Sequence, residues 1–178
     1  MQNVESGDER SADQKSQDEQ RMARAMELAS RAFDANEVPV GAVIMDAEGR
    51  IIGEGWNQSI SCHDPTAHAE IQAIRQAGQT LSNYRLVNCT LYVTLEPCTM
   101  CVGAIVHSRL SRVVFGALEP KAGAIVSASN LFEAPQFNHR VQWSGDTLAK
   151  SCGELMSSFF SKRRAALKGQ SKVKRTEK

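Results

Sequence analysis

The sequence predicts an α/β protein in which a mixed five-stranded sheet lies between two layers of helices, a three-layer α/β/α architecture. Three observations support this fold class. Two apolar segments near the start of the chain flank a turn and predict a hairpin. Strands then alternate with helices through the middle of the chain, an order that is typical of parallel neighbours. Helical periodicity marks the segments on both sides of this central block.

The size and composition of the chain limit the protein classes to consider. Its 178 residues are enough for one domain with its own core, and its 42% hydrophobic and 23% charged residues are typical of soluble globular proteins. No apolar run reaches the roughly 20 residues that cross a bilayer, and the polar first segment does not resemble a secretory signal. We therefore expect a cytoplasmic protein without membrane contact, whose five cysteines are thiols or metal ligands rather than disulfides.

Helical spacing marks the first and last elements, between two polar ends. Residues 1–17 are polar and aperiodic, and we expect a disordered N-terminal tail there. An amphipathic helix follows, with apolar residues every three or four positions: Met22, Met26, Ala29 and Phe33. The last helix has the same spacing: Leu148, Cys152, Leu155, Met156 and Phe159. We expect the domain to span residues 18–168 and residues 169–178 to form a disordered basic tail.

Strand and turn patterns place the remaining elements in order. The hairpin pairs residues 40–45 with residues 50–54. The second helix is predicted to start at Asp64, an N-cap followed by Pro65, and to end at Gly78. Three further strands are expected, at residues 91–95, 112–116 and 141–143. The residues between the last two, 118–139, are expected to be loop-like with a helical turn near Asn130, and residues 98–107 should form a helix after the break at Glu96-Pro97.

Two short segments carry residue types that bind zinc. His68 lies in a Thr-Ala-His-Ala-Glu segment, and Cys98 and Cys101 lie in a Pro-Cys-x-x-Cys segment at a helix start. Cysteines three apart on a helix share one face and can hold one ion. Zinc prefers four tetrahedral donors, so one His and two Cys leave one position for water. Zinc lowers the pKa of such a water to about 7, and the carboxylate of Glu70 is the predicted proton carrier.

Other interpretations of these residues remain open at this point. A lone Cys-x-x-Cys pair also fits a redox dithiol, although a dithiol needs no upstream His-x-Glu. A structural zinc site needs a fourth protein ligand, and the chain offers several: Cys62, His63, Cys89 and His107. Cys89 and Cys152 are more simply core residues, and His107 a favourable charge at a helix end. Spacing alone does not bring Glu70 to the metal, because positions i and i+2 lie on different faces of an ideal helix.

Several longer segments resemble the bacterial tRNA-specific adenosine deaminases, members of the cytidine deaminase-like superfamily. The matching segments are residues 37–43, 53–57, 63–70, 90–98, 112–117, 137–141 and 159–164. Together they cover most of the chain between about residues 20 and 168. The paired His-x-Glu and Pro-Cys-x-x-Cys motifs are the known zinc-deaminase signature, shared by many cytidine and guanine deaminases. The segments at 37–42, 138–140 and 159–164 are more particular to the tRNA enzymes.

The resemblance implies a fold, a reaction and a set of site residues. It implies a cytidine deaminase-like fold and a homodimer with one zinc ion per chain. It also implies hydrolysis of the wobble adenosine in a tRNA anticodon stem-loop to inosine, with release of ammonia, after the base is flipped into the pocket. The implied substrate-binding residues are Asn57, which hydrogen-bonds the base, and Glu119, Lys121, Asn138, Phe159, Arg163 and Arg164, which lie near the RNA. The family commonly carries Asp at the position of Glu119. The glutamate keeps the negative charge and has one more methylene group.

The charge distribution bears on the choice of substrate. The net charge is only +1, but the first twenty residues lean acidic and the segment from Lys162 to Lys178 is strongly basic. A basic end is typical of contact with a polyanion or of a solvated tail. A deaminase of free bases or nucleotides is the nearest alternative, and such an enzyme has no use for a Phe-Phe…Lys-Arg-Arg helix. A non-enzymatic RNA-binding module with a structural zinc site is the other alternative, and it requires a fourth protein ligand.

Overall fold

The computed structural model describes residues 11–176, with side chains up to residue 168. The elements follow one another in this order: α1 (Ala12–Asp34), β1 (Gly41–Met45), β2 (Ile51–Trp56), α2 (Ala69–Leu81), β3 (Thr90–Leu95), α3 (Thr99–His107), β4 (Arg112–Ala117), the 3₁₀ turn η1 (Leu131–Glu133), β5 (Gln142–Ser144) and α4 (Ala149–Thr176). Along this part of the chain, no helix combines the length and apolar character that crossing a bilayer requires.

The strands form one mixed five-stranded sheet in the order β2-β1-β3-β4-β5. β1 pairs antiparallel with β2 and with β3, whereas β3–β4 and β4–β5 are parallel pairs. The hairpin, the five strands and the parallel crossover through α3 are therefore confirmed. The strands that flank α2 are not neighbours, because β1 lies between β2 and β3. The expectation that the strands before and after α2 are parallel neighbours is therefore wrong, because β1, the other strand of the hairpin, occupies the place between them.

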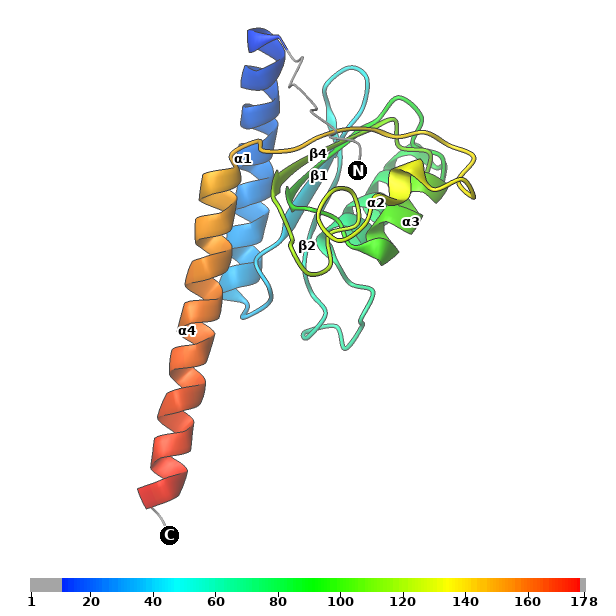
Figure 1. The fold of residues 1–178 in the computed structure, drawn as a ribbon. Helices are drawn as coiled ribbons and strands as arrows, with labels where there is room; N and C mark the ends of the chain where they lie inside the picture. Colours follow the sequence, from blue (N-terminus) through cyan, green and yellow to red (C-terminus); the bar gives the residue numbers. More distant parts are fainter. Residues whose placement is uncertain (1–10, 177–178) are drawn as a thin grey trace.

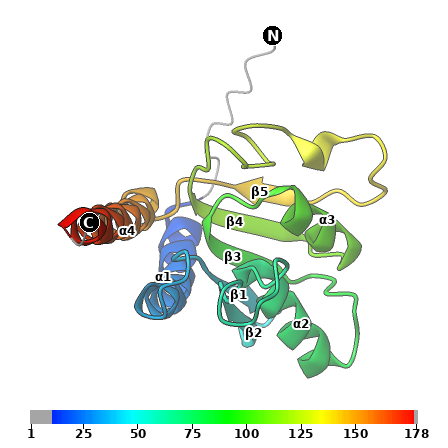
Figure 2. The ribbon, with the colours of Figure 1, turned by 90° about the horizontal axis from the view of Figure 1, so that it is seen from below.

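Helices cover both faces of the sheet, which confirms the three-layer architecture (Figures 1 and 2). Successive side chains of a strand point to opposite faces. Ile44, Leu91 and Val113 pack with residues of α2 and α3 in one cluster, whereas Val43 and Tyr92 pack with residues of α1 and α4 in another. In Figure 1, α4 lies beside α1 and continues past the rest of the molecule.

Two glycines of β2 let helix α2 lie directly against the sheet. A Cβ atom at Gly53 would lie 2.3 Å from the carbonyl oxygen of Ala73, and one at Gly55 would lie 2.2 Å from that of Ala69. Any larger residue at either position would push the helix away. The close approach fixes the N-terminus of α2, where His68 is located.

The start of α2 differs from the prediction. Asp64 does not cap the helix; its Oδ1 accepts hydrogen bonds from the backbone N–H and the hydroxyl of Thr66, both at 2.7 Å, and closes a turn. The helix begins at Ala69 with His68 as N-cap, and it ends at Leu81 rather than at Gly78. Asx residues close such turns and cap helices with the same short side chain, so the local sequence does not separate the two structures.

Both expected tails are partly helical. Ser11 caps α1, and residues 12–17 are helical rather than disordered. Asp18, which is fully buried, pairs with Arg112 at 2.7 Å and anchors this first part of the helix.

At the other end of the chain, α4 runs to Thr176, past the expected boundary at residue 168. The segment after Arg164 contains good helix formers, and its single glycine costs only about 1 kcal/mol relative to alanine. Predictions for residues 1–10 and 177–178 lie outside the described residues, and the domain bounds at residues 18–168 stay a prediction.

The segment between β4 and β5 follows the prediction closely. It has no strand of its own, and its one helical turn, η1, follows Asn130. β5 is shifted by one residue from the expected segment, 141–143. Early in this long connection, Gly123 forms a bridge with Cys98 at the N-terminus of α3, where the cysteines of the predicted metal site lie.

Candidate metal centre

The three predicted zinc donors form a compact triangle. The Sγ atoms of Cys98 and Cys101 are 3.7 Å apart, and the Nδ1 atom of His68 lies 3.8 Å from the first and 3.6 Å from the second. Zinc bonds of about 2.3 Å to sulfur and about 2.0–2.1 Å to nitrogen, at tetrahedral angles, place two sulfurs about 3.8 Å apart and a sulfur and a nitrogen about 3.6 Å apart. The donor set and its spacing therefore fit one tetrahedral zinc ion.

Two helix N-termini deliver these donors. His68 is the N-cap of α2 and Cys98 the N-cap of α3, both with extended backbones, and Cys101 lies in the first turn of α3. The side-chain Oδ1 atom of Asn57 accepts a hydrogen bond from the backbone N–H of Ala69 at 2.8 Å and so takes the capping role that the His68 side chain leaves free. The positive ends of both helices face the site, which favours thiolates there.

No fourth protein donor joins the triangle among the residues whose side chains are described. Cys89 is buried at the start of β3 and contacts the carbonyl of Val87, as expected for a core residue. Cys62 and His63 lie on the exposed loop before α2, and His107 lies exposed at the far end of α3. The three-donor arrangement leaves one tetrahedral position for water and argues against a structural zinc site.

A hydrogen bond joins the two cysteine sulfurs. The hydrogen bond with Cys101 lowers the pKa of Cys98 to about 4, with a further contribution from His68. The same hydrogen bond, followed by burial, raises the pKa of Cys101. The contact with Cys98 also raises the pKa of His68 above its usual value. A divalent ion that binds to sulfur replaces such a proton, so both cysteines can serve as thiolates.

Glu70 lies beside the triangle and is 4% exposed. Its carboxylate contacts the thiol of Cys101, and burial raises its pKa above the ordinary value of a glutamic acid. Because His68 caps the helix with an extended backbone, the rule for positions i and i+2 of an ideal helix does not apply to this pair. The structure therefore brings together the four residues that the sequence proposes for metal binding and proton transfer.

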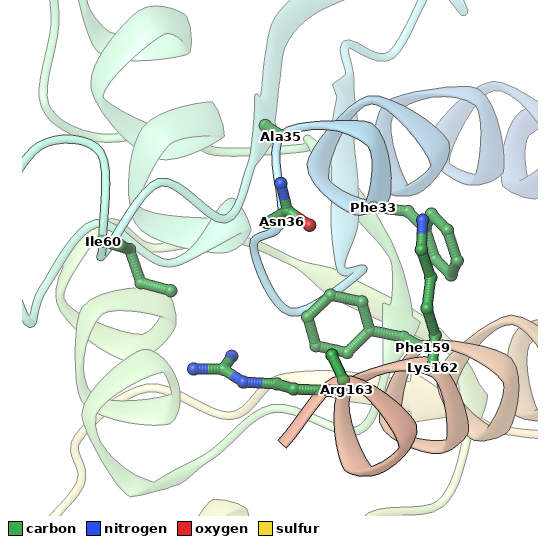
Figure 3. A pocket seen from close by; sticks show the side chains of 8 residues that line it. Phe33, Ala35, Asn36, Ile60, Phe159, Lys162 and Arg163 are labelled. Atoms are coloured by element: carbon green, nitrogen blue, oxygen red, sulfur yellow. The ribbon is translucent and has the colours of Figure 1, made fainter. Parts of the chain in front are cut away.

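Four of the predicted RNA contacts line two hollows, one on each side of α4. Lys121 and Arg164 line a groove of about 400 Å³ together with Met156, Ser157 and Phe160. Phe159 and Arg163 line a pocket of about 310 Å³ with residues from the end of α1 and from the loop before α2 (Figure 3). The remaining lining residues of this pocket are Phe33, Ala35, Asn36, Ile60, Lys162 and Ala166.

The two adjacent phenylalanines of α4 differ in accessibility. Phe159 is 4% exposed and packs edge-on against Phe33, with ring centroids 5.6 Å apart. Phe160, which is not among the predicted site residues, is 40% exposed in the groove. Consecutive residues of a helix point in directions about 100° apart, so the position of Phe159 on the apolar stripe was the signal that its neighbour faces outward.

Two other predicted contacts lie outside these hollows. Asn138 is exposed and accepts a hydrogen bond from Arg109 at 2.7 Å. Glu119 is half-buried, and its Oε1 accepts the backbone N–H of Lys121 at 3.0 Å. Neither residue contacts the zinc triangle among the described interactions.

Comparisons with known proteins agree with this geometry. The family model for the cytidine and deoxycytidylate deaminase zinc-binding region matches residues 15–117. A tRNA-specific adenosine deaminase of Haemophilus influenzae is 54% identical over 83% of this chain and 85% of its own length. A structure from a study of A-to-I editing by tRNA:A34 deaminases at the wobble position of transfer RNA is 39% identical, with a TM-score of 0.74 over 76% of this chain and 98% of its own.

A guanine deaminase of Bacillus subtilis is more distant in structure. It is 36% identical over 82% of this chain and 93% of its own, with a TM-score of 0.53. Deaminases of different substrates thus share this fold, while the higher identity and structural similarity lie with the tRNA enzymes. The chain belongs to the zinc-binding cytidine and deoxycytidylate deaminase family and, within it, to the tRNA-specific adenosine deaminases.

Proposed function

We propose that this protein is a tRNA-processing hydrolase that deaminates the wobble adenosine of a tRNA anticodon to inosine and releases ammonia. The observation that supports the chemistry most strongly is the zinc triangle with a buried carboxylate beside it, Glu70. The substrate assignment rests on the 54% identity to a tRNA-specific adenosine deaminase over most of both chains. A zinc deaminase that acts on RNA flips the target base out of its stack to reach it.

The proposed mechanism assigns each proton transfer to Glu70. When bound by His68, Cys98 and Cys101, zinc supplies the Lewis acidity that makes a water nucleophilic near neutral pH. The carboxylate of Glu70 takes a proton from this water as its oxygen attacks C6 of the adenine, and delivers the proton to N1. Glu70 then transfers the second proton of the same oxygen to the amino group, and the C6–N bond breaks to release ammonia. The products, inosine and ammonia, account for all atoms of adenosine and water.

Asn57 is the proposed base-binding residue. It is 8% exposed and directly precedes the loop that leads to the zinc ligand His68. Its side-chain oxygen already accepts a hydrogen bond from the N–H of Ala69, so the NH₂ group is the part of the side chain that remains for contact with a base. We propose that this donor orients the adenine above the metal.

The proposed RNA surface combines cations with aromatic rings, the combination that binds unstacked nucleotides. Lys121 and Arg164 line the same groove as the exposed ring of Phe160. On the other side of α4, Lys162 lies over the ring of Phe33 and Arg163 over that of Phe159. We propose that the cations meet phosphates, that Phe160 stacks on a base, and that buried Phe159 supports this surface from below. Glu119 and Asn138 are proposed to contact the anticodon loop near its ends.

We also propose a homodimer that acts in the cytoplasm, where its tRNA substrate is found. We propose that the partner packs against α3. Three residues of this helix that are not fully buried are small or apolar (Met100, Gly103 and Ala104), and a Cβ atom at Gly103 would meet no other atom within 4 Å. Light scattering of the purified protein at assay concentration tests the dimer, and an active monomer would contradict it.

The direct test of the function is deamination of an anticodon stem-loop. Purified protein with zinc is incubated with a stem-loop that carries adenosine at the wobble position, and inosine is detected as guanosine by sequencing. Free adenosine, cytosine and guanine are assayed in parallel at the same concentrations. We expect conversion of the stem-loop at the wobble position alone. Faster turnover of a free base than of the stem-loop would instead identify a small-molecule deaminase.

A further inference from the structure

One buried carboxylate outside the zinc triangle accepts an unusual number of hydrogen bonds. Glu96, which is 2% exposed, follows β3 directly. Its Oε1 accepts the backbone N–H groups of Ile125 at 3.1 Å, Val126 at 2.7 Å and Ser127 at 2.9 Å. Its Oε2 accepts the N–H of Glu119 at 3.1 Å and the hydroxyl of Ser127. All five donors belong to one segment, residues 119–127, which we call the strap.

The strap also lies against the metal ligand that follows Glu96. The N–H of Ala124 donates to the carbonyl of Pro97 at 2.9 Å, and Gly123 forms a bridge with Cys98. A Cβ atom at Gly123 would lie 2.3 Å from Oε2 of Glu96, so a larger residue would displace the carboxylate or the strap. The strap has no strand or helix of its own, so Glu96 provides acceptors for backbone donors that a regular element would otherwise satisfy.

The strap forms one wall of the groove in the proposed RNA surface. It carries Lys121, which lines the groove opposite Phe160 and Arg164 of α4. The same segment is fixed at its start by Glu119, whose N–H binds Glu96 and whose Oε1 accepts the N–H of Lys121. The hydrogen bonds to Glu96 therefore determine where the Lys121 backbone lies relative to α4.

We infer that Glu96 is a positioning residue for RNA recognition, which holds the strap so that Lys121 meets a phosphate of the substrate. The zinc ion depends on other side chains, those of His68, Cys98 and Cys101. Glu96 thus links the end of the β-strand that leads to the zinc site with the loop that contacts the RNA. This inference rests on the proposed tRNA substrate.

The test uses Glu96→Gln, which keeps the size of the side chain. Both oxygens of Glu96 accept hydrogen bonds from N–H or O–H groups of the strap. In either orientation of a glutamine amide, its NH₂ group would therefore face one of these donors and lose the hydrogen bond. Binding of the stem-loop to the zinc-loaded protein is measured at several salt concentrations, with and without Lys121→Ala. In the wild-type background Lys121→Ala should reduce the slope of log K against log salt by about 0.7, the value of one phosphate contact on single-stranded RNA. In the Glu96→Gln background it should reduce the slope by less than half of that amount, because the contact is already lost.

Glu37→Gln is the matched control. Glu37 is also 2% exposed and accepts backbone N–H groups, from Ile60 at 3.1 Å and Ser61 at 2.7 Å, but it holds the loop before α2. The Lys121→Ala effect should remain complete in this background. If Glu96→Gln does not fold, Ser127→Ala replaces it, since it removes one of the donors and keeps the backbone ones; the Lys121→Ala effect should then be measurably smaller than in the wild type.

The outcomes separate this inference from the proposed function. A complete Lys121→Ala effect in the Glu96→Gln background, or in Ser127→Ala where that replaces it, overturns the inference. An absent effect in the wild type overturns it too, because the strap then does not contact the RNA. Loss of zinc from Glu96→Gln, measured by metal analysis, would show that Glu96 acts through Cys98 instead. If the wild-type protein does not deaminate the stem-loop at all, the proposed function fails before the strap is tested.

Discussion

The zinc centre and the proposed RNA surface are built in different ways. The zinc donors sit at two helix N-termini, where one donor, Cys101, and the neighbouring Glu70 are almost fully buried. The RNA surface consists of exposed side chains on one helix and one loop, among them Lys121, Phe160 and Arg164. The reacting groups are thus positioned by the core, whereas recognition depends on side chains that a few hydrogen bonds hold in place. Substitutions in the two regions should therefore affect different measurements.

The largest effect is expected at the zinc centre, from Glu70→Gln. The amide keeps the shape of the side chain but cannot carry a proton, so both proton transfers lose their catalyst. General acid–base catalysis contributes about 10²–10⁴-fold for each transfer, so the single-turnover rate on the stem-loop should fall by at least the upper value. Zinc content, measured in the same sample, should not change. A variant that keeps more than about a tenth of the wild-type rate would show that this residue does not carry the proton.

The next largest effect separates Phe159 from its neighbour Phe160. Phe159→Ala removes a buried ring that packs against Phe33, and such truncations cost about 3–5 kcal/mol of unfolding free energy. Phe160→Ala should cost little stability but weaken binding of the stem-loop, by about 1–3 kcal/mol if the ring stacks on a base. Urea unfolding and stem-loop binding of both variants measure the two quantities. Equal stability losses would contradict the difference in burial.

The smallest effect per residue is expected from the cations of α4. Replacing Lys162, Arg163 and Arg164 together should raise KM for the stem-loop and leave the single-turnover rate at saturation nearly unchanged. Each lost phosphate contact should reduce the slope of log K against log salt by about 0.7 on a single-stranded loop and by about 0.9 on a duplex. Unchanged binding would return this end of α4 to the interpretation of a solvated surface.

The same contrast explains what could be predicted from the sequence. The zinc donors were predictable because few residue types bind the metal and the Cys-x-x-Cys spacing at a helix start brings both sulfurs to one side. The start of α2 was not predictable from Asp64 and Pro65, because its cap comes from the side chain of Asn57, twelve residues before Ala69. The first turns of α1 depend in the same way on a buried ion pair between Asp18 and Arg112, 94 residues apart.

The role of Glu96 shows the same limit at the RNA surface. Its place between an apolar strand and Pro97 was visible in the sequence as a break, but its donors lie 23 to 31 residues further along the chain. Lys121 and Arg164 were predicted from resemblance, and only the structure shows that they line one groove with Phe160. Contacts set by tertiary packing of a loop leave no periodic pattern in a single sequence.

The most direct test of the catalytic zinc site is X-ray absorption spectroscopy at the zinc edge of the purified protein. Three protein donors and one water predict two sulfur neighbours at about 2.3 Å and two nitrogen or oxygen neighbours at about 2.0–2.1 Å. Cys101→Ser, examined alongside, should lose one sulfur from this set or lose the metal. A wild-type spectrum with three or four sulfur neighbours would mean that another cysteine completes the coordination, and the open position on which the proposed mechanism depends would not exist.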